Sequence, residues 1–274
     1  MKIPSIAGVL CGMLILVGCA SYDVADRTSL IERIAEQHRF RRMDIRTDRF
    51  DLVSFVGLRT NGGVLRVYIE GDGFAWVTRR EPSRNPTPIN PIAFTLAVLD
   101  DQDVVYLARP CQYTTISEKE CNPRYWTSAR FAPEVIEAMD EAITRLKRQF
   151  GDRKLMLIGY SGGGTVAALI AARRNDVAAL VTVAGNVDHK TWTRLHALPE
   201  LRGSLNPPDH RHALAGVRQT HFVGEADNVV PIDVYRSYRK SFPEDANILV
   251  NVVPRVDHSC CWDSVWPDLL KALR

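Results

Sequence analysis

The chain has 274 residues, a formal net charge of +3, 46% hydrophobic residues and 24% charged residues. This length suits one large α/β domain and leaves too little chain for a second full domain. The apolar content excludes a disordered chain, and the small charge excess argues against a nucleic-acid partner. A local basic cluster comprises Arg39, Arg41, Arg42, Arg46 and Arg49. We expect it to be a solvated face, and the alternative is a role near anionic lipid headgroups.

The start of the chain has the features of an export signal. An apolar run from Ile6 to Val17 is too short to be a comfortable membrane span. It ends in Leu16-Val17-Gly18-Cys19, which resembles a bacterial lipobox. That resemblance implies that residues 1–18 are a lipoprotein signal peptide and that Cys19 is lipidated. Ala20 in the next position then implies the outer membrane, with the protein facing the periplasm. The alternative is a simple signal peptide with a coincidental cysteine.

The remaining cysteines fit an oxidising compartment, where disulfides persist. Cys111 and Cys121 would close a short loop, and we expect them to be bonded. Cys260 and Cys261 are adjacent, and we expect two small buried thiols rather than a vicinal disulfide. No paired C-x-x-C spacing is present, so we expect no metal.

Beyond the leader, residues 19–45 are expected to form a polar tether and an N-terminal helix, and residues 46–274 a single domain. Apolar runs predict strands at Leu155–Ile158 and Val177–Ala184, and apolar alternation predicts one at Phe50–Leu58. Further strands are predicted at Val64–Ile69, Val104–Ala108, Gln219–Val223 and Asn247–Val253. Helices are predicted at Ile92–Leu99, Pro133–Phe150, Val166–Ala172, Ile232–Phe242 and Ser264–Leu273. The alternation predicts an α/β fold, with a mostly parallel central sheet and helices on both faces. Residues 189–216 show little periodicity and are expected to form a small lid or insert.

The sequence Gly159-Tyr160-Ser161-Gly162-Gly163 lies between a predicted strand and a predicted helix, and matches G-x-S-x-G. Neighbours without a Cβ allow chain segments to approach closely at such a turn. Ser161 would then project its hydroxyl above the carboxyl end of the strand. The N–H of Gly162, at the start of the helix, is placed to stabilise an oxyanion. Gly-rich turns are common, so the strand-turn-helix context carries this interpretation.

A serine hydroxyl needs a base to take its proton, and the base needs an acid to orient it. Asp227 follows the strand Gln219–Val223, and His258 follows the last strand. Functional residues in open α/β sheets collect at the carboxyl ends of the strands. Asp188 and Asp257 are the alternative acids. The alternative bases are His189, His196, His210, His212 and His221.

The chain order Ser161, Asp227, His258 resembles the α/β-hydrolase superfamily, and more loosely its exported bacterial lipoproteins. The resemblance covers roughly residues 50–274, and includes the acid loop Gly-Glu-Ala-Asp-Asn-Val-Val-Pro. It implies an α/β-hydrolase fold and cleavage of an ester or related acyl bond through an acyl-enzyme, without a cofactor. The implied partners are a small-molecule or lipid-like acyl substrate and, through the lipid, the membrane.

The same resemblance points to a second oxyanion donor. The loop Glu70-Gly71-Asp72-Gly73 follows an early strand, where family members often have His-Gly. The backbone N–H of Asp72 is the expected donor, with Gly73 as the alternative. The carboxylate of Asp72 is expected to point away from the oxyanion, because it would otherwise oppose the developing charge.

Two other functions stay open at this stage. One is a periplasmic serine peptidase, in which Asp72 and Glu225 supply negative charge near a substrate amine. The other is a non-catalytic lipoprotein that uses the hydrolase fold as a binding scaffold in the envelope.

Overall fold

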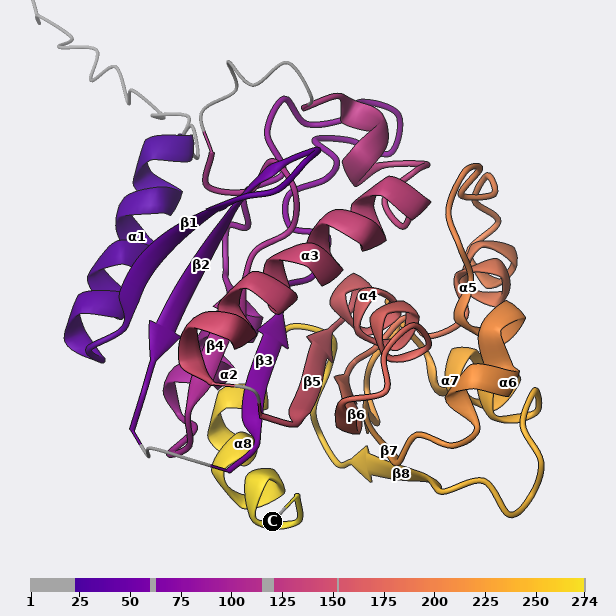
Figure 1. Ribbon diagram of the computed structural model, residues 1–274. Helices are drawn as coiled ribbons and strands as arrows, with labels where there is room; N and C mark the ends of the chain where they lie inside the picture. Colours follow the sequence, from indigo (N-terminus) through magenta and orange to yellow (C-terminus); the bar gives the residue numbers. More distant parts are fainter. Residues whose placement is uncertain (1–22, 60–62, 115–120, 152, 274) are drawn as a thin grey trace, which may run out of the picture.

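A computed structural model describes residues 23–59, 63–114, 121–151 and 153–273, and its centre is an eight-stranded sheet (Figure 1). The strand order is β1-β2-β4-β3-β5-β6-β7-β8. The strands are β1 (Arg41–Arg46), β2 (Asp51–Gly57), β3 (Leu65–Ile69), β4 (Val104–Leu107), β5 (Leu155–Tyr160), β6 (Val177–Val183), β7 (Gln219–Gly224) and β8 (Ile248–Val253). The β1–β2 and β2–β4 pairs are antiparallel, and the pairs from β4 through to β8 are parallel.

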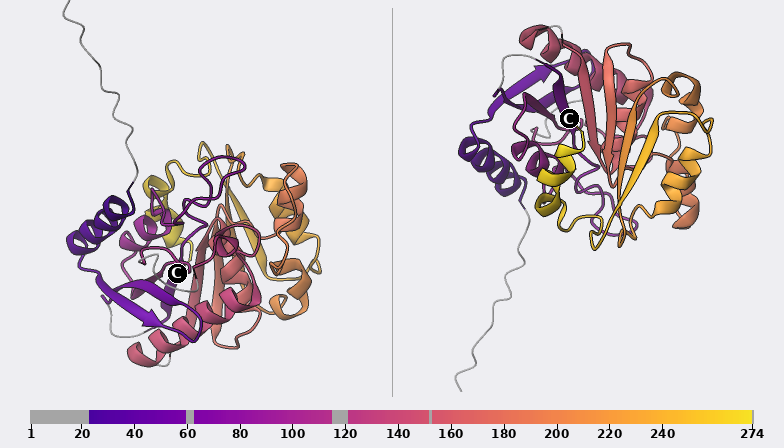
Figure 2. Two further views of the ribbon diagram at one scale, coloured as in Figure 1. Left: turned by 90° about the horizontal axis from the view of Figure 1, so that it is seen from above. Right: turned by 90° about the horizontal axis from the view of Figure 1, so that it is seen from below.

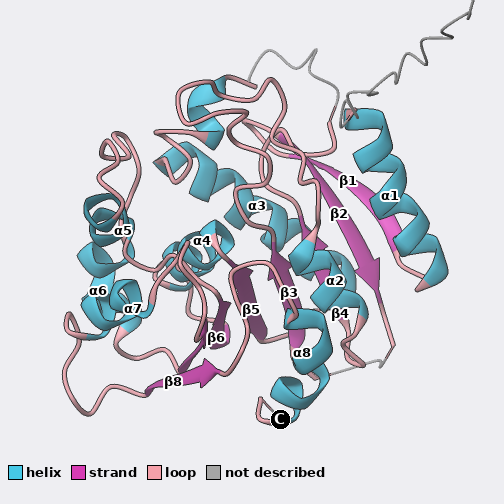
Figure 3. Ribbon diagram, turned by 180° about the vertical axis from the view of Figure 1, so that it is seen from behind, coloured by secondary structure: helices cyan, strands magenta, loops and turns pink. Residues whose placement is uncertain are grey.

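Helices cover both faces of the sheet (Figures 2 and 3). They are α1 (Val24–Gln37), α2 (Ile92–Val98), α3 (Pro133–Phe150), α4 (Gly162–Ala171), α5 (His189–Leu195), α6 (Arg211–Leu214), α7 (Ile232–Arg239) and α8 (Trp262–Lys271). Two short 3₁₀ helices, η1 (Pro123–Trp126) and η2 (Pro207–His210), lie in the connections. Buried side chains of α1, α2 and α8 form one core, and those of α3, α4, α6 and α7 form the other.

The strand β5 lies inside the sheet and is covered on both faces. Its residues are all buried, and alternate side chains point to opposite faces. Leu155 and Leu157 join the core beneath α3 and α4, whereas Met156 and Ile158 join the core beneath α2 and α8. A strand that is covered on both faces has no polar alternation, which is why the segment reads as a continuous apolar run.

β1 was not expected from the sequence. Its residues Arg41–Arg46 were divided between the tether and the start of the domain, yet they pair with β2 along the edge of the sheet. Only Ile45 is buried in this strand, and its arginines hide the apolar alternation. The sheet therefore begins before residue 46. The expected helix is present as α1, capped by the Asp23 side chain and packed through Ile31 and Ala35.

Residues 189–216 contain α5, η2 and α6, and α5 packs beside α7. The helices of this segment are four to seven residues long, which is too short to show a helical period in the sequence. The predicted signal peptide and Cys19 lie outside the described residues. Within the part of the chain that the structure describes, no helix is long and apolar enough to cross a membrane.

Candidate active site

Ser161 lies in a sharp turn between β5 and α4. Its backbone has φ 51° and ψ −120°, a positive φ that is costly for any residue with a Cβ. Its N–H donates to the Val183 carbonyl at 3.0 Å, which ties the turn to β6. A Cβ on Gly163 would lie 2.3 Å from the Ile69 carbonyl oxygen, so only glycine lets α4 approach β3 here. This geometry presents the Ser161 side chain above the carboxyl end of the sheet.

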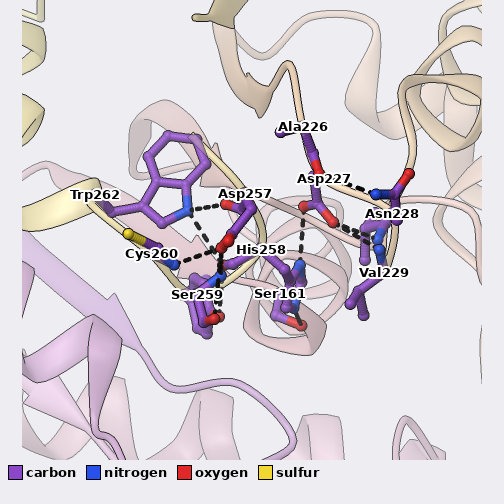
Figure 4. A network of polar contacts seen from close by, with 12 residues as sticks. Ser161, Ala226, Asp227, Asn228, Val229, Asp257, His258, Ser259, Cys260 and Trp262 are labelled. Carbon is purple, nitrogen blue, oxygen red and sulfur yellow. Dashed lines mark hydrogen bonds and ion pairs between the residues drawn. The ribbon is translucent and has the colours of Figure 1, made fainter. Parts of the chain in front are cut away.

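His258 lies after β8 and reaches Ser161 with one ring nitrogen and Asp227 with the other (Figure 4). Its Nε2 is 3.0 Å from the Ser161 Oγ. Its Nδ1 is 2.8 Å from the Asp227 Oδ2. The structure thus brings together three side chains that are far apart in the sequence and that the sequence analysis had named.

The Asp227 carboxylate is held by the loop that follows β7. Its Oδ1 accepts the backbone N–H groups of Val229 and Val230 at 2.9 and 2.8 Å. The side chain of Asp227 is fully buried, and its Oδ2 remains for His258. A carboxylate in this position favours the tautomer with the proton on Nδ1, which leaves Nε2 as the acceptor for the serine proton.

The turn that carries His258 is fixed by its own backbone contacts. The His258 carbonyl accepts the Tyr160 hydroxyl at 2.9 Å and the Trp262 indole N–H at 3.2 Å. The Asp257 carboxylate accepts the two backbone N–H groups that follow His258, at 2.8 and 2.6 Å. Tyr160 precedes Ser161, so the strand that carries the serine also positions the loop that carries the histidine.

The loop Glu70–Gly73 follows β3 and lies against the Ser161 turn. Gln112 donates to the Gly71 carbonyl at 3.0 Å and holds the loop from one side. The backbone N–H of Asp72 has no acceptor among the residues that the structure describes, and the same is true of Gly162 at the start of α4. These two N–H groups are available to an oxyanion.

Glu70 is a buried acid at the base of this loop. Its carboxylate accepts the Gly71 N–H at 2.9 Å, the Ala93 N–H at 3.4 Å and the Tyr106 hydroxyl at 3.1 Å. Burial raises the pKa of Glu70 to about 7 despite these hydrogen bonds. The side chain of Glu70 therefore points into the fold and braces the loop from beneath.

Several solved structures share this architecture. Est1E from Butyrivibrio proteoclasticus matches with a TM-score of 0.59 and 12% identity, over 85% of this chain and 96% of that one. An esterase from Pyrococcus furiosus matches with a TM-score of 0.58 and 13% identity, over 85% and 90%. An alpha-beta serine hydrolase homologue from Coxiella burnetii matches with a TM-score of 0.57 and 15% identity, over 85% and 95%. The chain has the α/β-hydrolase fold.

The family model described as alpha/beta hydrolase fold also matches residues 114–196, which include the Ser161 turn. No curated protein sequence matches the chain significantly. The fold class expected from the sequence is therefore confirmed, and the hydrolase fold with its esterase and hydrolase neighbours supports an enzyme of this class.

The rival acids have other contacts in this hydrolase fold. Asp188 caps α5 and accepts hydrogen bonds from Thr191, Asn206 and Ser237. These contacts lower its pKa although burial acts in the opposite direction. Asp257 holds its own turn and makes no hydrogen bond to the imidazole among the described residues.

The rival histidines also lie elsewhere. They are His189, His196, His210, His212 and His221. Within the described residues, none of these rings is hydrogen-bonded to Ser161. His221 is buried between β6 and α7, and burial lowers its pKa to about 3, so this imidazole is neutral at pH 7. It is a core residue of the fold.

The two cysteine predictions have different outcomes. Cys111 and Cys121 form a disulfide, as expected. Cys260 and Cys261 are also bonded to each other, and both are exposed, so the prediction of buried thiols is wrong. Trp262 takes the buried position in this turn instead. Cys261 has φ 78°, in the left-handed region, and this reversal leaves the pair on the surface where α8 begins.

Sequence reasoning missed two residues beside the serine turn, Arg109 and Arg130. Arg109 follows β4 at the carboxyl end of the sheet, and Arg130 precedes α3. Both guanidinium groups are buried and contact the Asp72 carboxylate. The position of Arg109 after an apolar strand was the available signal. Arg130 has none, because it belongs to an irregular segment.

Proposed function

We propose that the protein is a serine hydrolase that cleaves an ester or related acyl bond. The observation that carries the proposal is the continuous hydrogen-bonded chain from Asp227 through His258 to Ser161. Its three members follow β7, β8 and β5, so the rigid sheet sets their spacing. Such a relay turns a weak hydroxyl into a nucleophile.

Catalysis follows from these contacts in two half-reactions. His258 Nε2 takes the Ser161 proton as Oγ bonds to the acyl carbon, and the carbonyl oxygen becomes an oxyanion facing the N–H groups of Gly162 and Asp72. The imidazolium, stabilised by Asp227, returns the proton to the leaving oxygen as the acyl bond breaks. Water then gives a proton to His258 as it attacks the acyl carbon, and His258 passes that proton to the Ser161 Oγ as the acyl–serine bond breaks, which releases the acid.

An ester substrate is favoured by the structural neighbours. One of them is described as an esterase, and another as a membrane phospholipase A that matches with a TM-score of 0.54 and 14% identity. We include in the proposal the envelope location, with a lipid on Cys19, which would bring the enzyme to lipid-like acyl substrates. The lipobox resemblance is the support for this location.

The peptidase alternative loses part of its support. It requires Asp72 and Glu225 to be available for a substrate amine. Asp72 instead contacts Arg109 and Arg130, and Glu225 accepts the backbone N–H of Arg255 at 3.2 Å. A carboxylate that is already neutralised by guanidinium groups attracts an ammonium group weakly.

Labelling with a fluorophosphonate tests the nucleophile. The unaltered protein should be labelled on Ser161, and Ser161→Ala should not be labelled while its circular dichroism is unchanged. Ser259→Ala is the matched control, because Ser259 is an exposed hydroxyl next to His258 that lies outside the relay. Label that persists in Ser161→Ala would remove the nucleophile from the proposal. Absence of label on Ser161 of the unaltered protein would favour the non-catalytic scaffold.

A substrate comparison separates the enzyme classes. Turnover of p-nitrophenyl esters should exceed turnover of aminoacyl p-nitroanilides with the same acyl group. The opposite preference would favour the peptidase. For the location, mass spectrometry of the mature protein should find a diacylglycerol on Cys19 that Cys19→Ser abolishes, and an unlipidated native N-terminus would contradict the anchor.

A further inference from the structure

Three charged side chains surround the oxyanion side of the Ser161 turn. The Asp72 carboxylate lies 3.4 Å from the Arg109 Nη1 through Oδ1 and 2.5 Å from the Arg130 Nη1 through Oδ2. The two arginine side chains are 4% and 6% exposed, whereas that of Asp72 is 19% exposed. Two buried guanidinium groups thus share one carboxylate.

The Asp72 carboxylate lies beside the Ser161 turn. It lies against Gly162, where an added Cβ would be 2.2 Å from the Asp72 Oδ1. An unpaired carboxylate next to an oxyanion donor would oppose the charge that forms in the transition state. The structure pairs it with two cations, so the group of three carries a net positive charge.

The Arg109 guanidinium keeps its positive charge at neutral pH. Burial lowers the pKa of Arg109 to about 10, which still leaves it protonated at pH 7. Glu70 is the other acid that acts on Arg109, and its own carboxyl group is partly protonated near pH 7. Arg109 therefore remains a cation in the working enzyme.

Neither arginine is free to leave its place. Arg109 donates through Nη2 to the Arg130 carbonyl, and its guanidinium lies 5.3 Å from the centre of the Phe131 ring. Arg130 donates through Nε to the Thr127 carbonyl at 2.7 Å. Because these contacts are to backbone and to a buried ring, the guanidinium groups act on the loop and not on a substrate directly.

We propose that Arg109 and Arg130 are positioning residues of the oxyanion site: they fix Asp72 against Gly162 and replace a repulsive charge by a net positive one. The inference rests on the proposed function, because it concerns the oxyanion that Ser161 would generate. A transition state gains from donors and charges that are already in place, and the ion-pair group supplies both at the Asp72 N–H. Asp72 then contributes to the oxyanion site through its contacts with the two arginines.

The experiment compares Arg130→Gln and Arg130→Lys with the unaltered enzyme. Arg130→Gln removes the charge and should lower kcat for a p-nitrophenyl ester by about 10- to 100-fold, less than the loss of a direct oxyanion donor. KM should stay within about threefold, because the substrate carbonyl is uncharged before attack. Affinity for a trifluoromethyl ketone, whose adduct with Ser161 carries the oxyanion, should fall in parallel with kcat. Arg130→Lys should recover part of both losses.

Arg174→Gln is the matched control. Arg174 is a part-buried arginine that also binds two carboxylates, those of Asp140 and Asp176, beyond the opposite end of α4 from Ser161. Its loss should lower thermal stability and leave kcat within about threefold. If Arg130→Gln proves too unstable to purify, Arg109→Lys and Arg130→Lys carry the test, with smaller parallel losses in kcat and ketone affinity expected.

The outcomes separate the inference from the proposed function. Unchanged kcat in Arg130→Gln, or a change confined to KM, would overturn the positioning role while fluorophosphonate still labels Ser161. A loss of ketone affinity no larger than that in Arg174→Gln would overturn it as well. If Ser161 of the unaltered protein fails to label, the proposed function fails first.

Discussion

Asp188 and Asp227 occupy equivalent places at the carboxyl ends of neighbouring strands. Asp188 follows β6 and Asp227 follows β7, and both are buried. Asp227 accepts two hydrogen bonds from its own loop, whereas the donors to Asp188 include Asn206 and Ser237, which are distant in the chain. Only Asp227 also reaches a histidine, because its two loop contacts both go to Oδ1 and leave Oδ2 for His258.

The difference shows how a similar loop is used for two purposes. Both oxygens of Asp188 are taken by α5, η2 and α7, through Thr191, Asn206 and Ser237. Asp188 therefore joins three surface elements. In Asp227, Oδ1 accepts hydrogen bonds from its own loop and Oδ2 is hydrogen-bonded to His258. A buried acid at a strand end is thus structural or functional according to whether the surrounding residues occupy both of its oxygens or only one.

Replacing Asp227 gives the largest expected effect. Asp227→Asn keeps the shape but presents an amide that favours the wrong imidazole tautomer, so kcat should fall by about 10⁴-fold. Steady-state ester hydrolysis measures this, and circular dichroism checks the fold. A loss below tenfold would assign the orienting role to another acid.

A third buried carboxylate, Glu70, sharpens the comparison because it touches neither histidine nor arginine directly. Its pKa is raised from 4.5 to about 7, so the folded state holds a proton that the unfolded chain releases between these values. Stability should therefore fall as the pH rises through this window, by about 3 kcal/mol in total. Glu70→Gln, which mimics the protonated acid, should remove that dependence.

Urea denaturation at pH 5 and pH 8.5 tests the prediction. Glu70→Gln should match the unaltered protein at pH 5 and exceed it at pH 8.5. Equal stability of the two proteins at pH 8.5 would show that Glu70 ionises without penalty. Tyr106→Phe is a useful control, because it removes one hydrogen bond from Glu70 and leaves the titrating group.

Replacing Asp188 should affect stability rather than rate. Asp188→Asn places an amide N–H among groups that donate hydrogen bonds, which should cost about 1–3 kcal/mol in the free energy of unfolding. Because His258 is untouched, kcat should stay within about threefold. Denaturant unfolding and ester kinetics on the same preparation give both values. A loss in kcat as large as that of Asp227→Asn would break the distinction between the two acids.

The exposed pair Cys260–Cys261 should have the smallest effect. The His258 carbonyl is held by Tyr160 and Trp262 independently of the disulfide. The double variant Cys260→Ser, Cys261→Ser should therefore keep kcat within about threefold in ester hydrolysis. A loss beyond tenfold would show that the disulfide itself sets the position of the base.

Much of the fold could be predicted because the central strands are covered on both faces. β5 and β6 read as apolar runs, and α3 shows its Pro start, apolar face and Gly stop almost to the residue. β1 could not be predicted, because an edge strand rich in arginine has too little apolar alternation.

The meeting of Ser161, Asp227 and His258 was predicted because strand ends converge in parallel sheets and the motifs lie at such ends. The partners of Asp72 were not, since the arginines that contact it lie 37 and 58 residues away in irregular segments. Spacing in the sequence carries no information on such contacts. Likewise, nothing in two adjacent cysteines indicates that Trp262 will take the buried place in their turn.

The start of α1 limits how far an anchored enzyme could stand from a membrane. The helix begins at Val24, five residues after Cys19, and packs onto the domain through Ile31 and Ala35. Five residues span at most about 18 Å even when fully extended. With a lipid on Cys19, the polar tether expected from the sequence would hold the start of α1 within that distance of the lipidated residue. It would work as an interfacial enzyme, drawing substrates from the two-dimensional pool beside it.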